Sequence, residues 1–362
     1  ENFLDAIAES GGLTPPLQDA VADAVVSYHQ GLSPLSDVLP PMRQIAMGNV
    51  SSAISAGLPE SDVRDWRNTV IAALDAVHPL LARRAVAGLV RRAHGDLHLG
   101  NLCLWQGRPV PFDALEFDET LATIDLAYDL AFLLMDLDRQ ANRAAANRVL
   151  NRYIARTGDV EFLVPLLPFL SVRAMVRAHV LARSGRSVAW QPYLSAALDY
   201  LRPVTPVVVA VGGLTGSGKS TLARGLAPHI GCAPGAVILR SDEIRKRLHG
   251  FLPEQRLPQS AYAEASTQAV LTALVGGVSG AAGGCHSVVV DSTFSDLAQR
   301  RAVEAVAEAA GARFVGFWLD APLGELERRV TGRSGDASDA TVAVLRAAAN
   351  KRPAARSWHA LA

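Results

Sequence analysis

The chain has 362 residues, 49% hydrophobic and 19% charged, so it is long enough for two domains and too apolar to be a disordered chain. Its 35 basic and 35 acidic residues cancel, which argues against a nucleic-acid partner or an anionic membrane surface. Three cysteines are too few for a disulfide framework and favour a reducing, cytoplasmic location.

Two segments before residue 94 predict helices, because their apolar residues recur at intervals of three and four positions. They are LQDAVADAVVSYHQ (17–30) and VRDWRNTVIAALDAVHPLLARR (63–84). The stretch NLCLWQGRPVPF (101–112) predicts two short strands around Gln106-Gly107, and helical patterning then returns as far as about Tyr200. No basic-then-apolar leader precedes these elements, so we expect no signal peptide.

The motif HGDLHLGN, which begins at His94, has the spacing of a protein-kinase catalytic loop. In such loops an Asp accepts the proton of the acceptor hydroxyl and a following Asn binds Mg²⁺, which gives these roles to Asp96 and Asn101. Asp113, in the strand-like stretch PVPFDALEF, takes the place of the second Mg²⁺-binding Asp. We expect His94 and Asp125 to fix the loop by hydrogen bonds. The alternative is a helix-to-strand turn with a hydrogen-bonded His.

The stretch LRPVTP (201–206) interrupts the helical pattern with two prolines and predicts a linker between two domains, residues 1–200 and 207–362. After it, apolar, β-rich runs alternate with helical stretches, which indicates a doubly wound parallel sheet covered by helices on both faces. These runs are VVVAVGG (207–213), AVILRS (236–241), SVVVDS (287–292) and RFVGFWLD (313–320).

One segment, AVLTALVGGVSGAAGGCHSVVV (269–290), has no Asp, Glu, Lys or Arg and is long enough to pass for a membrane span. Its Gly-rich middle and its β-branched end indicate a helix, a turn and a buried strand instead. We therefore expect no membrane partner.

Residues 213–220, GLTGSGKS, match the P-loop pattern G-x-x-x-x-G-K-[ST] in full, between an apolar strand and a helical stretch. Glycines let the backbone N–H groups curl around phosphate oxygens at the start of that helix. The alternative is a Gly-rich strand-to-helix turn with a chance Lys-Ser pair. We expect ATP to be bound by Gly213, Leu214, Thr215, Gly216, Ser217, Gly218, Lys219, Ser220 and Thr221.

Two residues of this loop have predicted chemical roles. Lys219, one of only three lysines among the 35 basic residues, should reach the β- and γ-phosphates. The hydroxyl of Ser220 should ligate Mg²⁺.

The second strand of the predicted sheet leads into LRSDEIRKRL. The carboxyl ends of strands line the ligand crevice of a doubly wound sheet, so Asp242 should face the phosphates and activate an acceptor hydroxyl, while Arg245 holds the acceptor. This SD-x-x-R placement resembles small-molecule P-loop kinases. The alternative is that Ser241 or Asp242 only caps the following helix.

Asp291 ends the apolar run VVVDST, which is the Walker B arrangement for holding Mg²⁺ directly or through water. An Asp-Ser-Thr helix cap is the alternative.

In ELERRVTGRSGDASDA, the residues Arg328, Arg329 and Arg333 lie beside Gly332 and Gly335, as in a lid that closes on a transferring phosphoryl group. The alternative for the arginines is a solvated basic helix end. The interpretation of Asp336, Ser338 and Asp339 is that they only start the next helix.

The HGD loop resembles that of the aminoglycoside phosphotransferase family over roughly residues 10 to 200. Together with VGGLTGSGKSTLAR and LRSDEIRKRL, the whole chain resembles the bacterial proteins described as bifunctional aminoglycoside phosphotransferase/ATP-binding proteins. The resemblance implies a mostly helical, protein-kinase-like C-lobe followed by a P-loop NTPase domain with a doubly wound parallel sheet.

One departure from that family concerns nucleotide binding. Its N-lobe normally supplies a lysine to the α/β-phosphates, but 93 residues precede His94, they have a helical pattern, and no lysine occurs before Lys219. We therefore expect the N-lobe to be absent from this chain, and the non-Met start suggests a truncation.

The sequence leaves three functional hypotheses. The first is an ATP- and Mg²⁺-dependent kinase that acts on a small-molecule hydroxyl through the C-terminal domain. The second gives the HGD module its own phosphotransferase activity in the full-length protein. The third is a non-enzymatic module regulated by ATP. The sequence predicts no oligomeric state.

Overall fold

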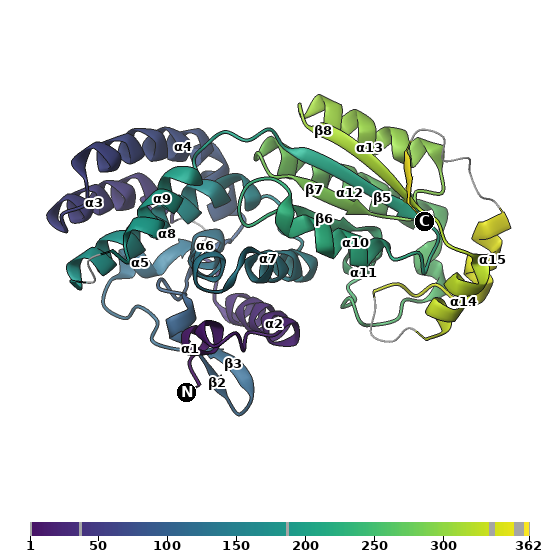
Figure 1. Ribbon diagram of the computed structural model, residues 1–362, viewed down its shortest axis with the longest axis horizontal. Coiled ribbons are helices and arrows are strands. Elements are labelled where there is room, and N and C mark those ends of the chain that lie inside the picture. Colours follow the sequence, from purple (N-terminus) through teal and green to yellow (C-terminus); the bar gives the residue numbers. More distant parts are fainter. Residues whose placement is uncertain (1, 36–37, 186–187, 333–336, 351–357, 362) are drawn as a thin grey trace. The chain divides into compact units, whose positions relative to one another are not determined.

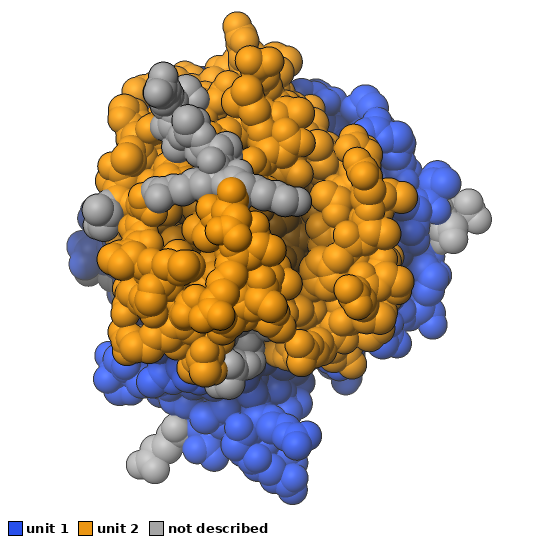
Figure 2. All heavy atoms as spheres, turned by 90° about the vertical axis from the view of Figure 1, so that its right-hand side faces the viewer, with its two compact units in different colours: residues 1–152, 162–203 blue, residues 153–161, 204–362 orange. Residues whose placement is uncertain are grey.

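The computed structural model describes residues 2–35, 38–185, 188–332, 337–350 and 358–361. The chain divides into two compact units, coloured separately in Figure 2. Unit 1 contains Glu1–Arg152 and Phe162–Pro203, and unit 2 contains Tyr153–Glu161 and Val204–Ala362. The division after Pro203 falls inside the predicted linker, whereas the assignment of 153–161 to unit 2 was not expected from the sequence.

Unit 1 is mostly helical, with two short antiparallel pairs of strands (Figure 1). Its helices are α1 (Leu4–Glu9), α2 (Pro15–Gly31), α3 (Met42–Ser55), α4 (Glu60–Val86), α5 (Glu119–Ala122), α6 (Leu126–Asp136), α8 (Leu163–Arg183) and α9 (Gln191–Asp199), with α7 (Arg143–Thr157) running into unit 2. Its strands are β1 (Val90–Arg92), which pairs with β4 (Thr123–Asp125), and β2 (Leu102–Trp105), which pairs with β3 (Arg108–Pro111). The predicted hairpin around Gln106 is confirmed.

Helices α6 and α8 form the centre of unit 1. Every residue of α6 is buried, and α8 packs against α3, α4, α6 and α9. The indole N–H of Trp66 on α4 donates to the Ser171 hydroxyl on α8 (2.8 Å), which in turn donates to the Ala197 carbonyl on α9 (2.6 Å). Helix α8 is long and apolar enough to cross a membrane, but 72% of its apolar window is buried inside the fold. Its composition is therefore explained by its place in the core.

Unit 2 contains a parallel sheet with the order β6-β7-β5-β8-β9. Its strands are β5 (Val207–Gly213), β6 (Val237–Arg240), β7 (Val288–Asp291), β8 (Arg313–Leu319) and β9 (His359–Leu361). Its helices are α10 (Lys219–Leu226), α11 (Ser241–Leu248), α12 (Glu264–Gly283), α13 (Leu297–Ala309), α14 (Leu323–Thr331) and α15 (Val342–Asn350). The predicted parallel sheet is confirmed, and β9 was not predicted.

Helices cover both faces of this sheet, as the unbroken apolar strands require. Val209 and Val211 of β5 join Ala223 of α10 in one core cluster. Helices α12 and α13 pack against each other and against the sheet, where the side chain of Leu239 meets Gly277 of α12. The segment 269–290 folds as a helix, a turn and a buried strand, as predicted.

Candidate active site

The P-loop joins the end of β5 to α10 and depends on two glycines. Gly213 has φ +141°, and a Cβ atom there would lie 2.5 Å from the Leu319 carbonyl oxygen. Gly216 has φ +85°, and a Cβ atom there would lie 2.9 Å from the Leu326 carbonyl oxygen. Side chains at these positions would be strained and would collide with neighbouring backbone, so the loop can take this path only with glycine.

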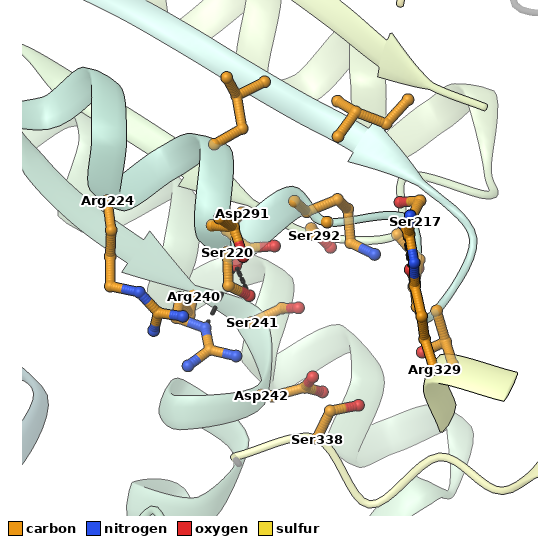
Figure 3. Close-up of a pocket in the computed structure, with 18 of the residues that line it drawn as sticks. Ser217, Ser220, Arg224, Arg240, Ser241, Asp242, Asp291, Ser292, Arg329 and Ser338 are labelled. Carbon is orange, nitrogen blue, oxygen red and sulfur yellow. Dashed lines mark hydrogen bonds and ion pairs between the residues drawn. The ribbon is translucent and has the colours of Figure 1, made fainter. Parts of the chain in front are cut away.

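The loop and the neighbouring strand ends line a cavity of about 760 Å³ (Figure 3). The Ser217 side chain lines it, and its hydroxyl is buried without a hydrogen-bond partner among the described residues. The Lys219 ammonium donates to the Leu214 carbonyl across the loop (2.9 Å). An orphaned hydroxyl, a lysine and the N-terminus of α10 together suit a phosphate ligand, so the residues present fit the triphosphate of ATP.

Asp291 is the last residue of β7 and lies against the P-loop. The Ser220 hydroxyl donates to its Oδ2 (2.6 Å), and the Arg240 Nε donates to the same oxygen (3.2 Å; Figure 3). The next helix begins at Leu297 and is capped by Asp296, so Asp291 is not a helix cap. Ser220 and Asp291 thus present two hard oxygen ligands at one point, which is a donor set suited to Mg²⁺.

Arg240 was not among the residues expected from the sequence. Besides Asp291, its Nη1 contacts Glu243 (3.0 Å), and its side chain is almost fully buried at the cavity wall. Arg240 ends an apolar run in the sequence, and that pattern does not predict that its side chain contacts the Asp291 carboxylate on the neighbouring strand.

Asp242 lies in the first turn of α11 and lines the same cavity. Residue Arg240 is the N-cap of α11, and no side chain caps this helix end, so the capping alternative for Ser241 and Asp242 is wrong. Burial raises the pKa of Asp242, and the nearby Asp291 carboxylate raises it further, against the opposing effects of neighbouring cations and Ser338. A carboxyl of raised pKa beside a phosphate-type cavity is a candidate general base.

Arg245, expected to hold the acceptor, lies one turn further along α11. Its Nη1 donates to the Ala261 carbonyl (2.9 Å) and to the Ser266 hydroxyl (3.3 Å), and its guanidinium lies 5.1 Å from the centre of the Tyr262 ring. It lines a second cavity, which Asp242 also lines.

Of the predicted lid arginines, Arg329 on α14 reaches the P-loop. Its Nη1 donates to the Gly216 carbonyl (3.3 Å) and its Nε to Glu325 (2.6 Å). Arg328 is exposed and also pairs with Glu325, and the hydrogen bonds from both arginines lower the pKa of Glu325 to about 2. Arg333 lies outside the described residues.

The suggestion that Asp339 starts the next helix is wrong. Helix α15 begins at Val342, and Asp339 instead accepts hydrogen bonds from the buried Lys246 ammonium (3.2 Å), the Leu257 N–H (2.9 Å) and the Tyr262 hydroxyl (2.9 Å). It therefore connects α11 to the segment before α12.

In unit 1, the HGD loop brings Asp96 and Asn101 into contact. The Asn101 amide donates to the Asp96 carbonyl (2.9 Å) and to its carboxylate (3.1 Å). Burial by itself raises the pKa of Asp96. The hydrogen bond from His98, together with the positive charges of His98, Arg173 and His94, has the larger effect, so the pKa of Asp96 is lowered overall. His98 belongs to the motif itself, two residues after Asp96, and was not singled out from the sequence.

Asp113 follows β3 instead of lying in a strand, has φ +59°, and is exposed. In the part of the chain that the structure describes, no hydrogen bond or ion pair joins it to Asp96 or Asn101, and no group of three or more His, Cys, Asp or Glu side chains suits a metal ion. Its neighbour Phe112 is bound to the loop, since its N–H donates to the Asn101 carbonyl (3.1 Å).

The loop is fixed partly by residues that the sequence did not indicate. His94 does contribute, through a 2.8 Å hydrogen bond to the Phe112 carbonyl. Asp125, however, pairs with the buried Arg84 (2.8 Å) and not with the loop. Asp129, one turn along α6, accepts the backbone N–H groups of the first two motif residues, at 3.1 and 2.9 Å.

Comparison with known proteins finds a family similar to the C-terminal unit. Residues 208–354 match the family described as AAA domain, so this part of the chain is similar to that family. Uncharacterized proteins of Mycobacterium tuberculosis and Mycobacterium bovis are each 30% identical over 283 residues. That alignment covers 75% of this chain and 56% of theirs, so the chain spans about half the length of the curated relatives it matches.

Solved kinases resemble part of the chain. A gluconokinase from Sinorhizobium meliloti 1021 is 20% identical, over 43% of this chain and 82% of that chain, with a TM-score of 0.30. The APS kinase of Mycobacterium tuberculosis in complex with AMPPNP and APS is 26% identical, over 36% of this chain and 71% of that chain, with a TM-score of 0.29. At TM-scores below 0.5, these likenesses carry no information about the acceptor.

Proposed function

We propose that unit 2 transfers the γ-phosphoryl group of ATP to the hydroxyl of a small molecule. The observation that carries this proposal is the position of Asp242. It lines the cavity formed by the P-loop and also lines a second cavity beside it, so one carboxylate can face both a bound phosphate and an acceptor.

In the proposed step, the acceptor hydroxyl oxygen attacks the γ-phosphorus, its bond to phosphorus forms, and the bond to the β–γ bridging oxygen breaks to release ADP. Asp242 takes the hydroxyl proton. Lys219 and the loop N–H groups hold the phosphates, and Arg329, already at the P-loop, donates to the transferring group.

Magnesium would be held by Ser220 and Asp291, which meet at 2.6 Å. When bound, it neutralises charge on the β- and γ-phosphates. The Arg240 guanidinium already contacts Asp291, so it can keep that carboxylate in place beside Ser220.

Two variants test the proposal. Lys219→Ala should abolish stabilisation of the protein by Mg²⁺-ATP, because the phosphates lose their cation. Asp242→Asn should leave ATP affinity nearly unchanged and lower transfer to the acceptor by about 10²- to 10⁴-fold, the usual contribution of a positioned general base. Because Asp242 is not a helix cap, a loss of activity cannot be traced to a lost cap.

The measurement is transfer from radiolabelled ATP to a panel of hydroxyl compounds, with thermal shift as the readout of binding. A folded Lys219→Ala variant that binds ATP tightly contradicts the nucleotide site. Unchanged transfer by Asp242→Asn contradicts the base assignment. Binding of ATP with no transfer to any acceptor instead favours the non-enzymatic, ATP-regulated alternative.

The HGD module is a second candidate phosphotransferase, favoured by the direct hydrogen bonds between Asp96 and Asn101. In this alternative Asp96 is the base, and Asn101 and Asp113 hold Mg²⁺. It is tested with the full-length protein: Asp96→Asn should abolish an activity that Lys219→Ala leaves intact. Equal activity of Asp96→Asn and the parent protein contradicts it.

A further inference from the structure

A second cavity, of about 470 Å³, adjoins the phosphate cavity in unit 2, and its volume lies within the range of small-molecule pockets. Asp242 and Ser338 line both cavities, and Figure 3 shows these two side chains close together. A small molecule in the second cavity therefore lies beside the proposed base.

Most of the side chains that line the second cavity can form hydrogen bonds. They come from the P-loop, from α11, α12 and α13, and from the segments that precede α12 and follow β7. Many of them make no side-chain hydrogen bond within the part of the chain that the structure describes, so water or a ligand has to supply the partner. These are Thr215, Ser241, Gln259, Thr267, Ser292, Thr293, Ser295 and Gln299.

Two of these polar side chains stand on neighbouring helices. Thr267 lies near the start of α12 and Gln299 near the start of α13, and the two helices pack against each other. Both residues are half-buried, yet neither has a polar atom that is buried without a partner. The Thr267 hydroxyl and the Gln299 amide thus remain accessible to a ligand in the cavity.

Arg245 adds a charged donor to this lining. It bonds to the chain only through Nη1, to the Ala261 carbonyl (2.9 Å) and the Ser266 hydroxyl (3.3 Å), as far as the described residues show. Its Nε and Nη2 can therefore donate to a hydroxyl or carboxylate oxygen of a ligand. The Asp339 carboxylate, by contrast, is already bonded to the Lys246 ammonium and to two other groups.

The remaining lining is apolar and includes Val270 and Leu274 on α12, Leu345 on α15 and the buried Phe294. Such residues can contact the C–H groups of a carbon skeleton. An alcohol with a single hydroxyl would displace water from the polar lining and leave several of its groups unpaired, which costs free energy. A molecule with hydroxyls on several carbons replaces those lost hydrogen bonds.

From this lining we infer that the acceptor is a polyhydroxylated compound, of the chemical class of sugars, cyclitols and sugar acids. The inference rests on the proposed function. One hydroxyl of the acceptor lies beside Asp242 and receives the phosphoryl group, and a second oxygen accepts from Arg245. Thr267 and Gln299 bind further hydroxyls and so determine specificity.

The test measures acceptor binding separately from phosphoryl transfer. The protein is saturated with Mg²⁺ and AMPPNP, and binding of glucose, ribose, myo-inositol, gluconate and 3-phenylpropanol is measured by calorimetry. The same compounds are then offered as acceptors with radiolabelled ATP. We expect at least one of the polyhydroxylated compounds to bind and to be phosphorylated, and 3-phenylpropanol to do neither.

Matched variants locate the binding. Thr267→Val and Gln299→Leu nearly keep the size of the side chain and remove its hydrogen-bonding groups, so each should weaken binding of the polyhydroxylated compound by about 3- to 10-fold. Thr272→Val is the control on the same helix. Thr272 is exposed, its hydroxyl donates to the Gln268 carbonyl (3.0 Å), and it does not line the cavity, so this variant should bind like the parent protein.

The outcomes separate this inference from the proposed function. Binding of a polyhydroxylated compound that Thr267→Val and Gln299→Leu weaken, without transfer, supports the polyhydroxylated ligand and contradicts the kinase proposal. Phosphorylation of 3-phenylpropanol, with no binding of any polyhydroxylated compound, supports the kinase proposal and overturns the inference. Absence of binding by all of the polyhydroxylated compounds, or binding that both variants leave unchanged, overturns it as well.

Discussion

Replacing Gly213 by alanine should destabilise unit 2 and abolish nucleotide binding. The new Cβ atom would lie 2.5 Å from the Leu319 carbonyl oxygen and 2.8 Å from the Ser217 hydroxyl, and the residue would have to keep φ at +141°. Such backbone strain alone costs about 1–3 kcal/mol, and the collision with β8 backbone forces a further shift. We therefore expect the free energy of unfolding of unit 2 to fall by about 2–4 kcal/mol in total.

The control is the same substitution where the structure leaves room. Gly276 lies on the exposed side of α12, and a Cβ atom there meets nothing within 4 Å. Alanine has the higher helix propensity, so Gly276→Ala should stabilise unit 2 by about 0.5–1 kcal/mol and leave ATP binding intact.

Differential scanning calorimetry with and without Mg²⁺-ATP measures both effects. A loss of about 2–4 kcal/mol lowers the Tm of a domain of this size by about 4–16 °C. The transition of the Gly213→Ala variant should also no longer respond to Mg²⁺-ATP. A variant as stable as the parent protein that still binds ATP would refute the reasoning that the loop path requires glycine here.

Three further predictions concern Asp242, Lys246 and the isolated residues 1–200. Burial and the Asp291 carboxylate raise the pKa of Asp242, so the folded protein favours the protonated form of this side chain. The stability that this form contributes is present below the ordinary pKa of 3.8 and is lost as the pH rises through the pKa in the folded protein. Asp242→Asn should therefore raise Tm at pH 7 and give no such gain near pH 4; equal Tm values at pH 7 would contradict the pKa shift. Lys246→Met should lower the free energy of unfolding, measured with urea, by about 2–4 kcal/mol, because the substitution leaves Asp339 without its buried cation. An unchanged urea midpoint would show that the ion pair contributes nothing to stability. Isolated residues 1–200 should not bind ATP with useful affinity, since no lysine occurs in them, and low-micromolar binding in calorimetry would refute this.

The sequence alone determined the local features of the site. The P-loop could be predicted because phosphate binding demands glycines and a lysine within one short stretch, between a strand and a helix. The strands of the sheet were predicted nearly to the residue, since strands buried on both faces must be continuous apolar runs. The spacing of Asp96 and Asn101 indicated a kinase-like loop, whereas the hydrogen bond between their side chains is known only from the structure.

Only the tertiary structure decided which distant groups meet. Lys246 and Asp339 are 93 positions apart, and Arg240 and Asp291 are 51 apart; nothing in the local pattern of either segment indicates its partner. The short strand β9 also escaped prediction, because its three residues form a strand only by pairing with β8. Periodicity and propensity predict whether a segment forms a helix or a strand. They do not predict the partner of a buried charge, because a charge removed from water needs an opposite charge nearby, and the packing of the whole chain decides which residue supplies it.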